Sequence, residues 1–334
     1  MLTAADYLAI TPSGTRTQWR SIVARSRPVD GRRQVTFAPV ETLLCLAASL
    51  MVNHRRYGGS TAHRAEEPVP SLAKLFKRPN SSVLAKMANL DGSRSNGARH
   101  ELEVAARLLG GHVELAAIYR IVVRAARDVG IAANDLPDFL HLEHDEAPLI
   151  LLGQDELNAT DVAGAVWREH PNVGDELTES LLIAAARIGQ HRFARDVLKN
   201  HGHRCVFCGL AVTVDDQRAP RMLVASHIKP WRECDSRERL DVANGLTACP
   251  THDVAFDTGL LAVNGGLRIH IHSDLQRAVE ANPALHAAFG RPPLADRLLL
   301  PPNALGPQRT YLNWHRDRVY RGATVSWPVD QLGA

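Results

Sequence analysis

The chain has 334 residues and a mass of 36.6 kDa, enough for two domains that each bury a core. Hydrophobic residues make up 45% and charged residues 22%, an ordinary soluble composition, and no stretch approaches the roughly 18 uncharged apolar residues of a membrane span. The N-terminus shows no basic region followed by an apolar run, so we expect no secretory signal, no membrane partner and a cytoplasmic location. Five cysteines are too few for a disulfide scaffold.

Charge is distributed unevenly along the chain. The net charge is +9 over residues 1–130, −11 over 131–185 and +5 over 186–334, although the whole chain carries only +3. Basic blocks suit a polyanion such as nucleic acid, because each neutralised phosphate releases counterions. Charges that merely solvate a surface would produce the same pattern.

The first block, residues 1–130, is expected to form a helical domain. An apolar run over 37–52 with an early proline predicts one helix, and a long helical pattern over 98–129 is broken at Gly110-Gly111. Between them, two short helices around 72–76 and 82–90 are joined by a tight turn at Pro79.

These two short helices have the pattern of a helix-turn-helix, whose second helix enters the major groove of DNA. The side chains expected to reach the DNA are those of Asn80, Ser81, Ser82 and Lys86. The segments LAKLFKR and SSVLAKMANLD also resemble the winged-helix-like DNA-binding segment that precedes some nuclease domains. A plain helical hairpin with a basic solvent face is the alternative.

The acidic block is rich in Asp, Glu, Pro and Asn and has weak periodicity. We therefore expect a linker with short helices over residues 131–180. It is followed by a second domain over 181–325, which opens with a helix near Asp175 or Thr178. The predicted fold class is α+β: a mainly helical N-terminal domain and a mixed domain after it.

The second domain contains two pairs of metal-ligating residues. Cys-x-x-Cys occurs at Cys205 and Cys208, and Cys-x-x-His follows some forty residues later at Cys249 and His252. Four such ligands in two knuckles suit a closed, tetrahedral, structural zinc ion, whose binding also stabilises the fold. Buried thiols beside a surface histidine are the alternative. Cys234 has no partner at ligand spacing.

Between and after these pairs lie a strand that ends at His227, the loop residue Asn244 and a short helix over 250–258. The four ligands Cys205, Cys208, Cys249 and His252, called the clamp below, enclose this segment. With the clamp around it, this order resembles the HNH, or ββα-metal, endonucleases over residues 186–272. The resemblance rests on the motifs SHIKPW, NGL and CPTHDVAFDTG. It implies a nuclease in which His227 is the general base that activates water, and Asn244 holds the loop carrying His227.

The catalytic metal set departs from the pattern of many family members. Ser226 stands where many have Asp, and Asp253 where many have His. Asp253 and Asp257 share a helix face at i and i+4, so they could face the base and hold Mg²⁺ or Mn²⁺, or alternatively Ni²⁺. Alternatively, Asp253 only stabilises the helix N-terminus and Asp257 only caps a turn.

The resulting interpretation is a metal-dependent DNA endonuclease, with a helical reader and an HNH domain that cuts. Such a combination is typical of restriction enzymes, including those that act only on modified DNA. Since one active site cuts one strand, a homodimer would allow double-strand cleavage. The first alternative is a non-catalytic, zinc-containing DNA-binding protein with a degenerate HNH site. The second is a toxin-like nuclease.

Overall fold

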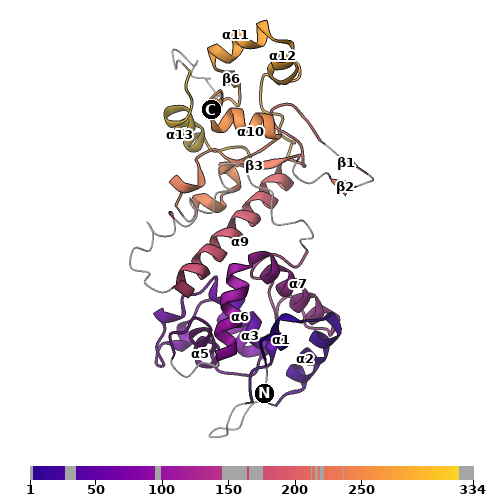
Figure 1. Ribbon diagram of the computed structural model, residues 1–334, viewed down its shortest axis with the longest axis vertical. Helices are drawn as coiled ribbons and strands as arrows, with labels where there is room; N and C mark the ends of the chain where they lie inside the picture. Colours follow the sequence, from indigo (N-terminus) through magenta and orange to yellow (C-terminus); the bar gives the residue numbers. More distant parts are fainter. Residues whose placement is uncertain are drawn as a thin grey trace. The chain divides into compact units, whose positions relative to one another are not determined.

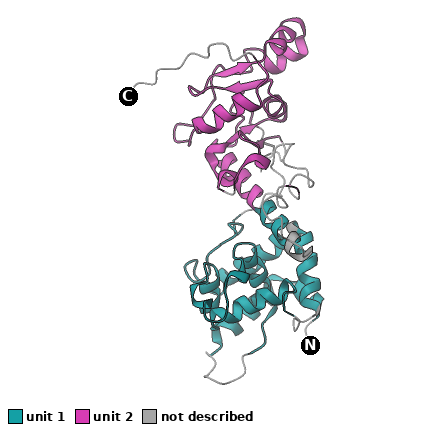
Figure 2. Cartoon of the chain, turned by 90° about the vertical axis from the view of Figure 1, so that its left-hand side faces the viewer, with its two compact units in different colours: residues 1–147, 166–188 teal, residues 148–165, 189–334 magenta. Residues whose placement is uncertain are grey.

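The computed structural model describes residues 3–26, 35–94, 99–144, 164, 176–211, 213–214, 217–218, 222–235 and 237–322. The chain divides into two compact units (Figure 2), which consist of residues 1–147 with 166–188 and of residues 148–165 with 189–334. The first unit is helical where described and the second is mixed, so the predicted α+β class is confirmed. Among the described residues, every helix is too short or too polar to cross a bilayer.

The first unit is built from seven α-helices among its described residues before position 129, with two short 3₁₀ turns, η1 and η2. These are α1 (Ala4–Leu8), α2 (Pro12–Ala24), α3 (Pro39–Ser49), η1 (His54–Arg56), η2 (Ala62–Arg64), α4 (Val69–Leu75), α5 (Asn80–Leu90), α6 (Arg99–Gly110) and α7 (His112–Asp128). Every residue of α3 is buried, so this helix forms the centre of the unit. Proline at its first position fits, because that position has no intrahelical donor to lose.

The helices expected in this unit are confirmed. The break at Gly110-Gly111 separates α6 from α7, and α4 and α5 form the predicted pair of short helices. The turn between them passes through Lys77, whose positive φ of 56° reverses the chain before Pro79. Helices α4 and α5 therefore form a helical hairpin, and its contact with DNA stays a prediction.

The acidic stretch does not begin as a free linker. Leu136, Leu140 and Leu142 are buried, and Arg127 of α7 forms an ion pair with Glu143 at 2.9 Å. This segment thus packs on the end of α7 and belongs to the first unit. The reason is its leucines, which are buried despite the acidic composition around them. The rest of the predicted linker lies largely outside the described residues.

The second unit follows α9 (Glu176–Asn200), a helix that begins in the first unit and ends in the second. Its further described elements are β1 (Thr213–Val214), β2 (Gln217–Arg218), β3 (Val224–His227), β4 (Gly245–Ala248), α10 (Pro250–Asp257), β5 (Leu261–Val263), β6 (Ile269–Ile271), α11 (Ser273–Ala281), α12 (Pro283–Phe289) and α13 (Arg309–Arg318). Short 3₁₀ turns cover Trp231–Glu233, Glu238–Leu240 and Val242–Asn244. The strands form three two-stranded sheets.

The β3–β4 sheet is the layer that positions the site. Its strands are antiparallel, and His227 pairs with Gly245. Figure 1 shows β3 between α9 and α10. Since side chains alternate along a strand, Ala225 joins the apolar cluster of α9, whereas Ser226 meets α10.

The C-terminal part of the unit packs on α10. The imidazole of His315, on α13, stacks on Phe256 with ring centroids 3.8 Å apart, and its Nε2 donates to the Phe256 carbonyl at 3.0 Å. Burial lowers the pKa of His315 to about 4. The tail therefore completes the core of the second unit and keeps this histidine neutral at pH 7.

Candidate functional site

The structure brings together the four predicted metal ligands of the second unit. One ligand atom each from Cys205, Cys208, Cys249 and His252 lies within 4.8 Å of the others. The first pair follows α9, whereas Cys249 caps α10 and His252 lies in its first turn. Three thiols and an imidazole, mostly buried, are a donor set that suits a tetrahedral ion.

The imidazole of His252 is held in an orientation that suits a ligand. Its Nε2 donates to the Ala288 carbonyl at 3.1 Å, so Nδ1 turns toward Cys249 Sγ at 3.1 Å. A hydrogen bond from the second ring nitrogen to a carbonyl is the usual way in which proteins orient a metal-bound histidine. The carbonyl comes from α12, so this helix supports the cluster.

His227 lies at the end of β3 and is only 3% exposed. Its ring stacks on Phe193 of α9, with centroids 3.5 Å apart and an interplanar angle of 9°. Its Nε2 lies 3.2 Å from the carbonyl oxygen of Arg239. Since a carbonyl only accepts, Nε2 carries the proton in the neutral ring and Nδ1 carries the lone pair that can take one.

Asn244 ties together two parts of the connection between β3 and β4, which follows His227. Its Oδ1 accepts from the Lys229 backbone N–H at 2.9 Å, and its Nδ2 donates to the Lys229 carbonyl at 3.3 Å. The same Nδ2 lies 3.1 Å from the carbonyl of Glu238, the residue before Arg239. Asn244 is fully buried, so these bonds replace water entirely. It thus holds both the strand end that carries His227 and the loop whose carbonyl orients it.

The two carboxylates of α10 lie one helical turn apart, and Asp257 contacts β3. The Ser226 hydroxyl donates to Oδ1 of Asp257 at 3.0 Å, and Asp253, one turn earlier, is fully buried. Alternation along β3 directs Ser226 toward α10 and His227 toward α9. That both carboxylates face His227 stays a prediction.

The predicted DNA-reading side chains of α5 are only partly offered to solvent. Ser81 is exposed, but Asn80 donates to the Ala62 carbonyl at 3.2 Å. Lys86 forms an ion pair of 2.6 Å with Glu101, and their side chains are 11% and 6% exposed. The expected contact of Lys86 with DNA stays a prediction. Ser82 is half-buried.

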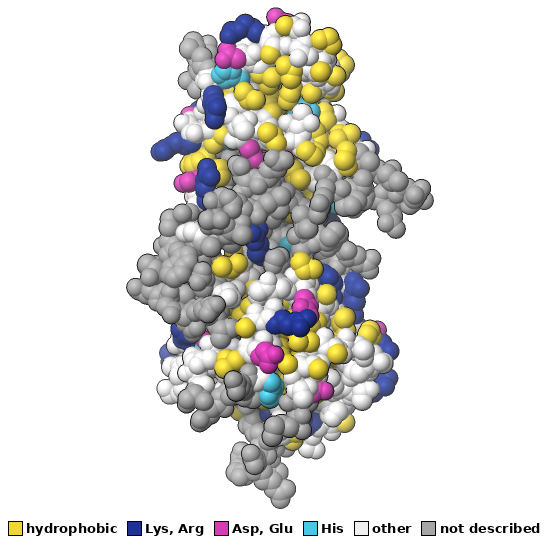
Figure 3. Space-filling view, viewed as in Figure 1, with side chains coloured by type: hydrophobic (Ala, Val, Ile, Leu, Met, Phe, Trp, Pro, Cys, Tyr) yellow, Lys and Arg dark blue, Asp and Glu magenta, His cyan; other side chains and the backbone are white. Residues whose placement is uncertain are grey.

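The exposed charges of the described residues do not gather into a single basic stripe on the face drawn in Figure 3. Lys and Arg side chains lie there among acidic and apolar ones. This face therefore adds no support for a continuous track along a DNA backbone.

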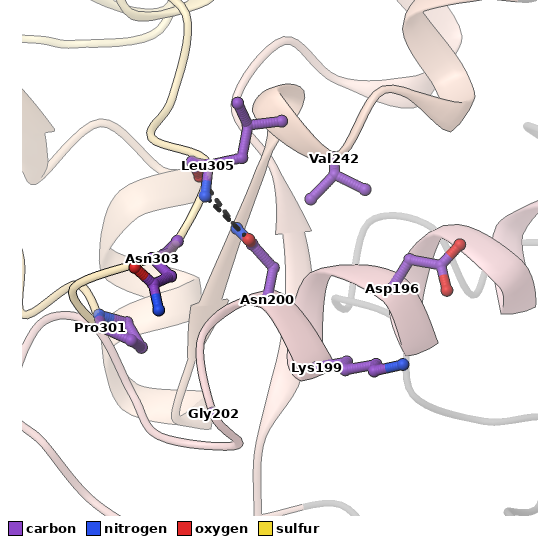
Figure 4. Close-up of a pocket in the computed structure, with 9 residues that line it drawn as sticks. Asp196, Lys199, Asn200, Gly202, Val242, Pro301, Asn303 and Leu305 are labelled. Carbon is purple, nitrogen blue, oxygen red and sulfur yellow. Dashed lines mark hydrogen bonds between the residues drawn. The ribbon is translucent and has the colours of Figure 1, made fainter.

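A pocket of about 530 Å³ lies beside the C-terminal end of α9 (Figure 4). At its edge Asn200 accepts from the Leu305 N–H and donates to the Leu305 carbonyl, both at 2.9 Å. Lys199 and Asp196 are the charged residues of its lining. One charge of each sign on a mostly apolar wall is not a set of residues suited to catalysis. The contacts of Asn200 show that the segment around Leu305 is anchored on α9.

Comparison with known families decides what this arrangement is. Residues 205–264 match a family described as HNH endonuclease. This segment is an HNH domain. The HNH match contains all four clamp residues, His227 and Asn244, as well as Asp253 and Asp257.

Comparison with solved structures finds a chain titled "Modification dependent TagI restriction endonuclease", with 23% identity and a TM-score of 0.27. The match covers 38% of this chain and 37% of that chain. Comparison with curated proteins finds no match.

Sequence reasoning missed two residues that contact His227, because both contacts join segments distant in the chain. Phe193 belongs to α9, outside the HNH match, and contacts the imidazole by stacking. Arg239 contributes only a backbone carbonyl, which no side-chain pattern reveals. The glycine at 245, opposite His227, is the one signal in the sequence that something packs closely there.

Proposed function

We propose that this protein is a DNA endonuclease that hydrolyses phosphodiester bonds. The observation that supports it most is the setting of His227 inside the HNH domain: the end of a strand, a fixed tautomer and a buried asparagine behind it. A neutral imidazole so held is suited to take a proton from an attacking water near pH 7.

In this mechanism the chain's own residues orient the base. The Arg239 carbonyl keeps the proton on Nε2, so Nδ1 accepts the proton of the water. Asn244 fixes the connection that follows His227 at Lys229 and Glu238, so the imidazole keeps its position through the reaction. Holding the base and the phosphate in one geometry supplies the larger part of such catalysis. The scissile phosphate would bind at the end of β3.

The carboxylates of Asp253 and Asp257 would hold a divalent ion. Their oxygen donors suit a hard ion such as Mg²⁺ or Mn²⁺, and the Ser226 hydroxyl already orients one oxygen of Asp257. When bound, such an ion stabilises negative charge on the phosphate and on the leaving oxygen. The four-residue clamp would hold zinc, which stabilises the fold and takes no part in the reaction.

The wider role that we propose is restriction of foreign DNA, including DNA that carries modified bases, by a protein acting in the cytoplasm as a dimer. The helical first unit would select the DNA, with Ser81 as the exposed contact of α5. The second candidate function is a non-catalytic DNA-binding protein. The burial of both His227 and Asp253 favours it, because neither side chain is open to solvent.

The metal-dependent part of the proposal is tested with Asp257→Asn. Its amide loses the negative charge that attracts the ion, so cleavage of supercoiled plasmid should fall at least about tenfold and need a higher Mg²⁺ concentration. Asp274→Asn, at an exposed position of α11, is the matched control and should cut like the wild type. Methylated and unmethylated plasmid should be compared, and equal cutting of both would contradict a dependence on that modification.

Full activity of Asp257→Asn at the same Mg²⁺ concentration would remove Asp257 from the metal site. Cleavage by the wild type in excess chelator would contradict metal dependence altogether.

A further inference from the structure

We infer that Phe193, on the helix that precedes the HNH domain, is a positioning residue for the general base His227. The inference rests on the proposed nuclease function and extends its site beyond the HNH match, which begins only at Cys205. It assigns to α9 a share of the active site.

Two contacts restrict the orientation of the imidazole. The Phe193 ring lies almost parallel to it at 3.5 Å, so it fixes the plane of the ring. The hydrogen bond from Nε2 to the Arg239 carbonyl, at 3.2 Å, fixes the rotation of the ring within that plane. The two contacts restrict different motions, because stacking limits the tilt of the ring and the hydrogen bond limits its rotation. A base must hold its lone pair toward the water, so both contacts contribute to its orientation.

The strand opposite His227 is built to admit the Phe193 ring. Gly245 pairs with His227, and a Cβ on it would lie 2.8 Å from Cζ of Phe193 and 2.3 Å from a methyl of Val197. Its φ of −124° is one that any residue adopts, so backbone conformation does not require glycine here. Glycine is required because a larger side chain would not fit. The close approach of α9 to the β3–β4 strand pair therefore depends on the absence of a side chain at Gly245.

Phe193 is also ordinary core material, since it is 1% exposed and clusters with Ala194, Val197 and Ala225. A purely structural role predicts that any apolar side chain of similar volume serves as well. A positioning role predicts that the flat ring is needed, because only a flat ring defines the plane of its neighbour. The two roles differ in what Phe193→Met does.

The test uses the full chain with Phe193→Met, which keeps most of the volume but not the ring. Val197→Ala is the matched control, because it removes packing from the same cluster on α9 but leaves both rings of the stack in the sequence. The readouts are the single-turnover rate of plasmid cleavage with Mg²⁺, DNA affinity, zinc content, and the proton NMR shifts of the His227 ring, assigned by comparison with His227→Gln.

In the wild type the stacked ring should move the His227 ring protons upfield, and Phe193→Met should abolish that shift. Cleavage by Phe193→Met should fall about 10- to 100-fold, with DNA affinity and zinc content within about twofold of the wild type. Val197→Ala should keep both the shift and most of the rate, although it is less stable.

A Phe193→Met protein that loses the upfield shift but cuts at the wild-type rate would overturn the positioning role and leave the nuclease standing. An equal loss of rate in Val197→Ala would assign the effect to packing and overturn it too. A wild type that cuts no DNA would overturn the proposed function, and with it this role. A His227 signal without the upfield shift would contradict the stack itself.

Discussion

Asn244 is the residue at which structure and chemistry of the site are most tightly joined. Asn244→Asp keeps the oxygen that accepts from Lys229 but replaces the donor nitrogen, so an oxygen faces the carbonyls of Lys229 and Glu238. The change also buries a charge at a fully buried position. We expect a loss of roughly 3 kcal/mol in the free energy of unfolding and a cleavage rate near background, measured by urea unfolding and plasmid assay. Wild-type stability in this variant would refute the proposed anchoring.

Candidate site residues could be picked out from the sequence where they follow one another in a recognisable order and spacing. The clamp residues, His227 and Asn244 stand out because ligand pairs and a strand-end histidine occur in a fixed sequence. The ion pair of Lys86 was not foreseen, since its partner Glu101 lies on another helix and no local pattern links them. Phe193 was invisible for the same reason. Contacts between distant segments decide such cases.

The clamp is the element on which the second unit depends. Cys205→Ser should lower bound zinc from about one per chain toward zero and reduce the unfolding temperature strongly, because metal binding contributes to folding. Cys234→Ser is the control: this thiol is buried but donates to the Lys229 carbonyl and lies outside the clamp. Zinc is measured by elemental analysis and unfolding by thermal scans. Full zinc content in Cys205→Ser would contradict the clamp.

Whole elements were predicted well where the apolar periodicity and the residues that end helices agreed. Helices α3, α4, α5 and α7 follow from runs bounded by proline, glycine or asparagine. The start of the acidic block was misread, because its leucines are buried on α7 while its charges suggested a linker. The layering of β3 between α9 and α10 could not be predicted, since it depends on packing across distant segments.

The stability of the whole molecule should fall in mild acid because of two buried histidines of the second unit. Burial lowers the pKa of His201 to about 4, as it does that of His315. Nδ1 of His201 accepts the Thr247 N–H, which only a neutral ring can do. Both groups bind protons more tightly when unfolded, so their contribution is full above about pH 6.5 and is lost as the pH falls toward 4.

The expected loss is roughly 3 kcal/mol for each histidine over that pH interval. It is measured by urea unfolding between pH 7.5 and 5. Because acid also weakens thiolate binding of metal, His315→Gln is compared with the wild type at each pH. The variant should show a shallower pH dependence, and an identical slope would argue against a titrating His315.

The central claim, that His227 is the base of a DNA-cutting site, is tested most directly by single-turnover cleavage of supercoiled plasmid with Mg²⁺ or Mn²⁺. Wild type, His227→Ala and the control His63→Ala, at an exposed position of the first unit, are compared at equal zinc content. We predict cutting by the wild type and the control, and a loss of at least about 100-fold in His227→Ala. Equal cutting by all three proteins, or by none of them, would contradict the account.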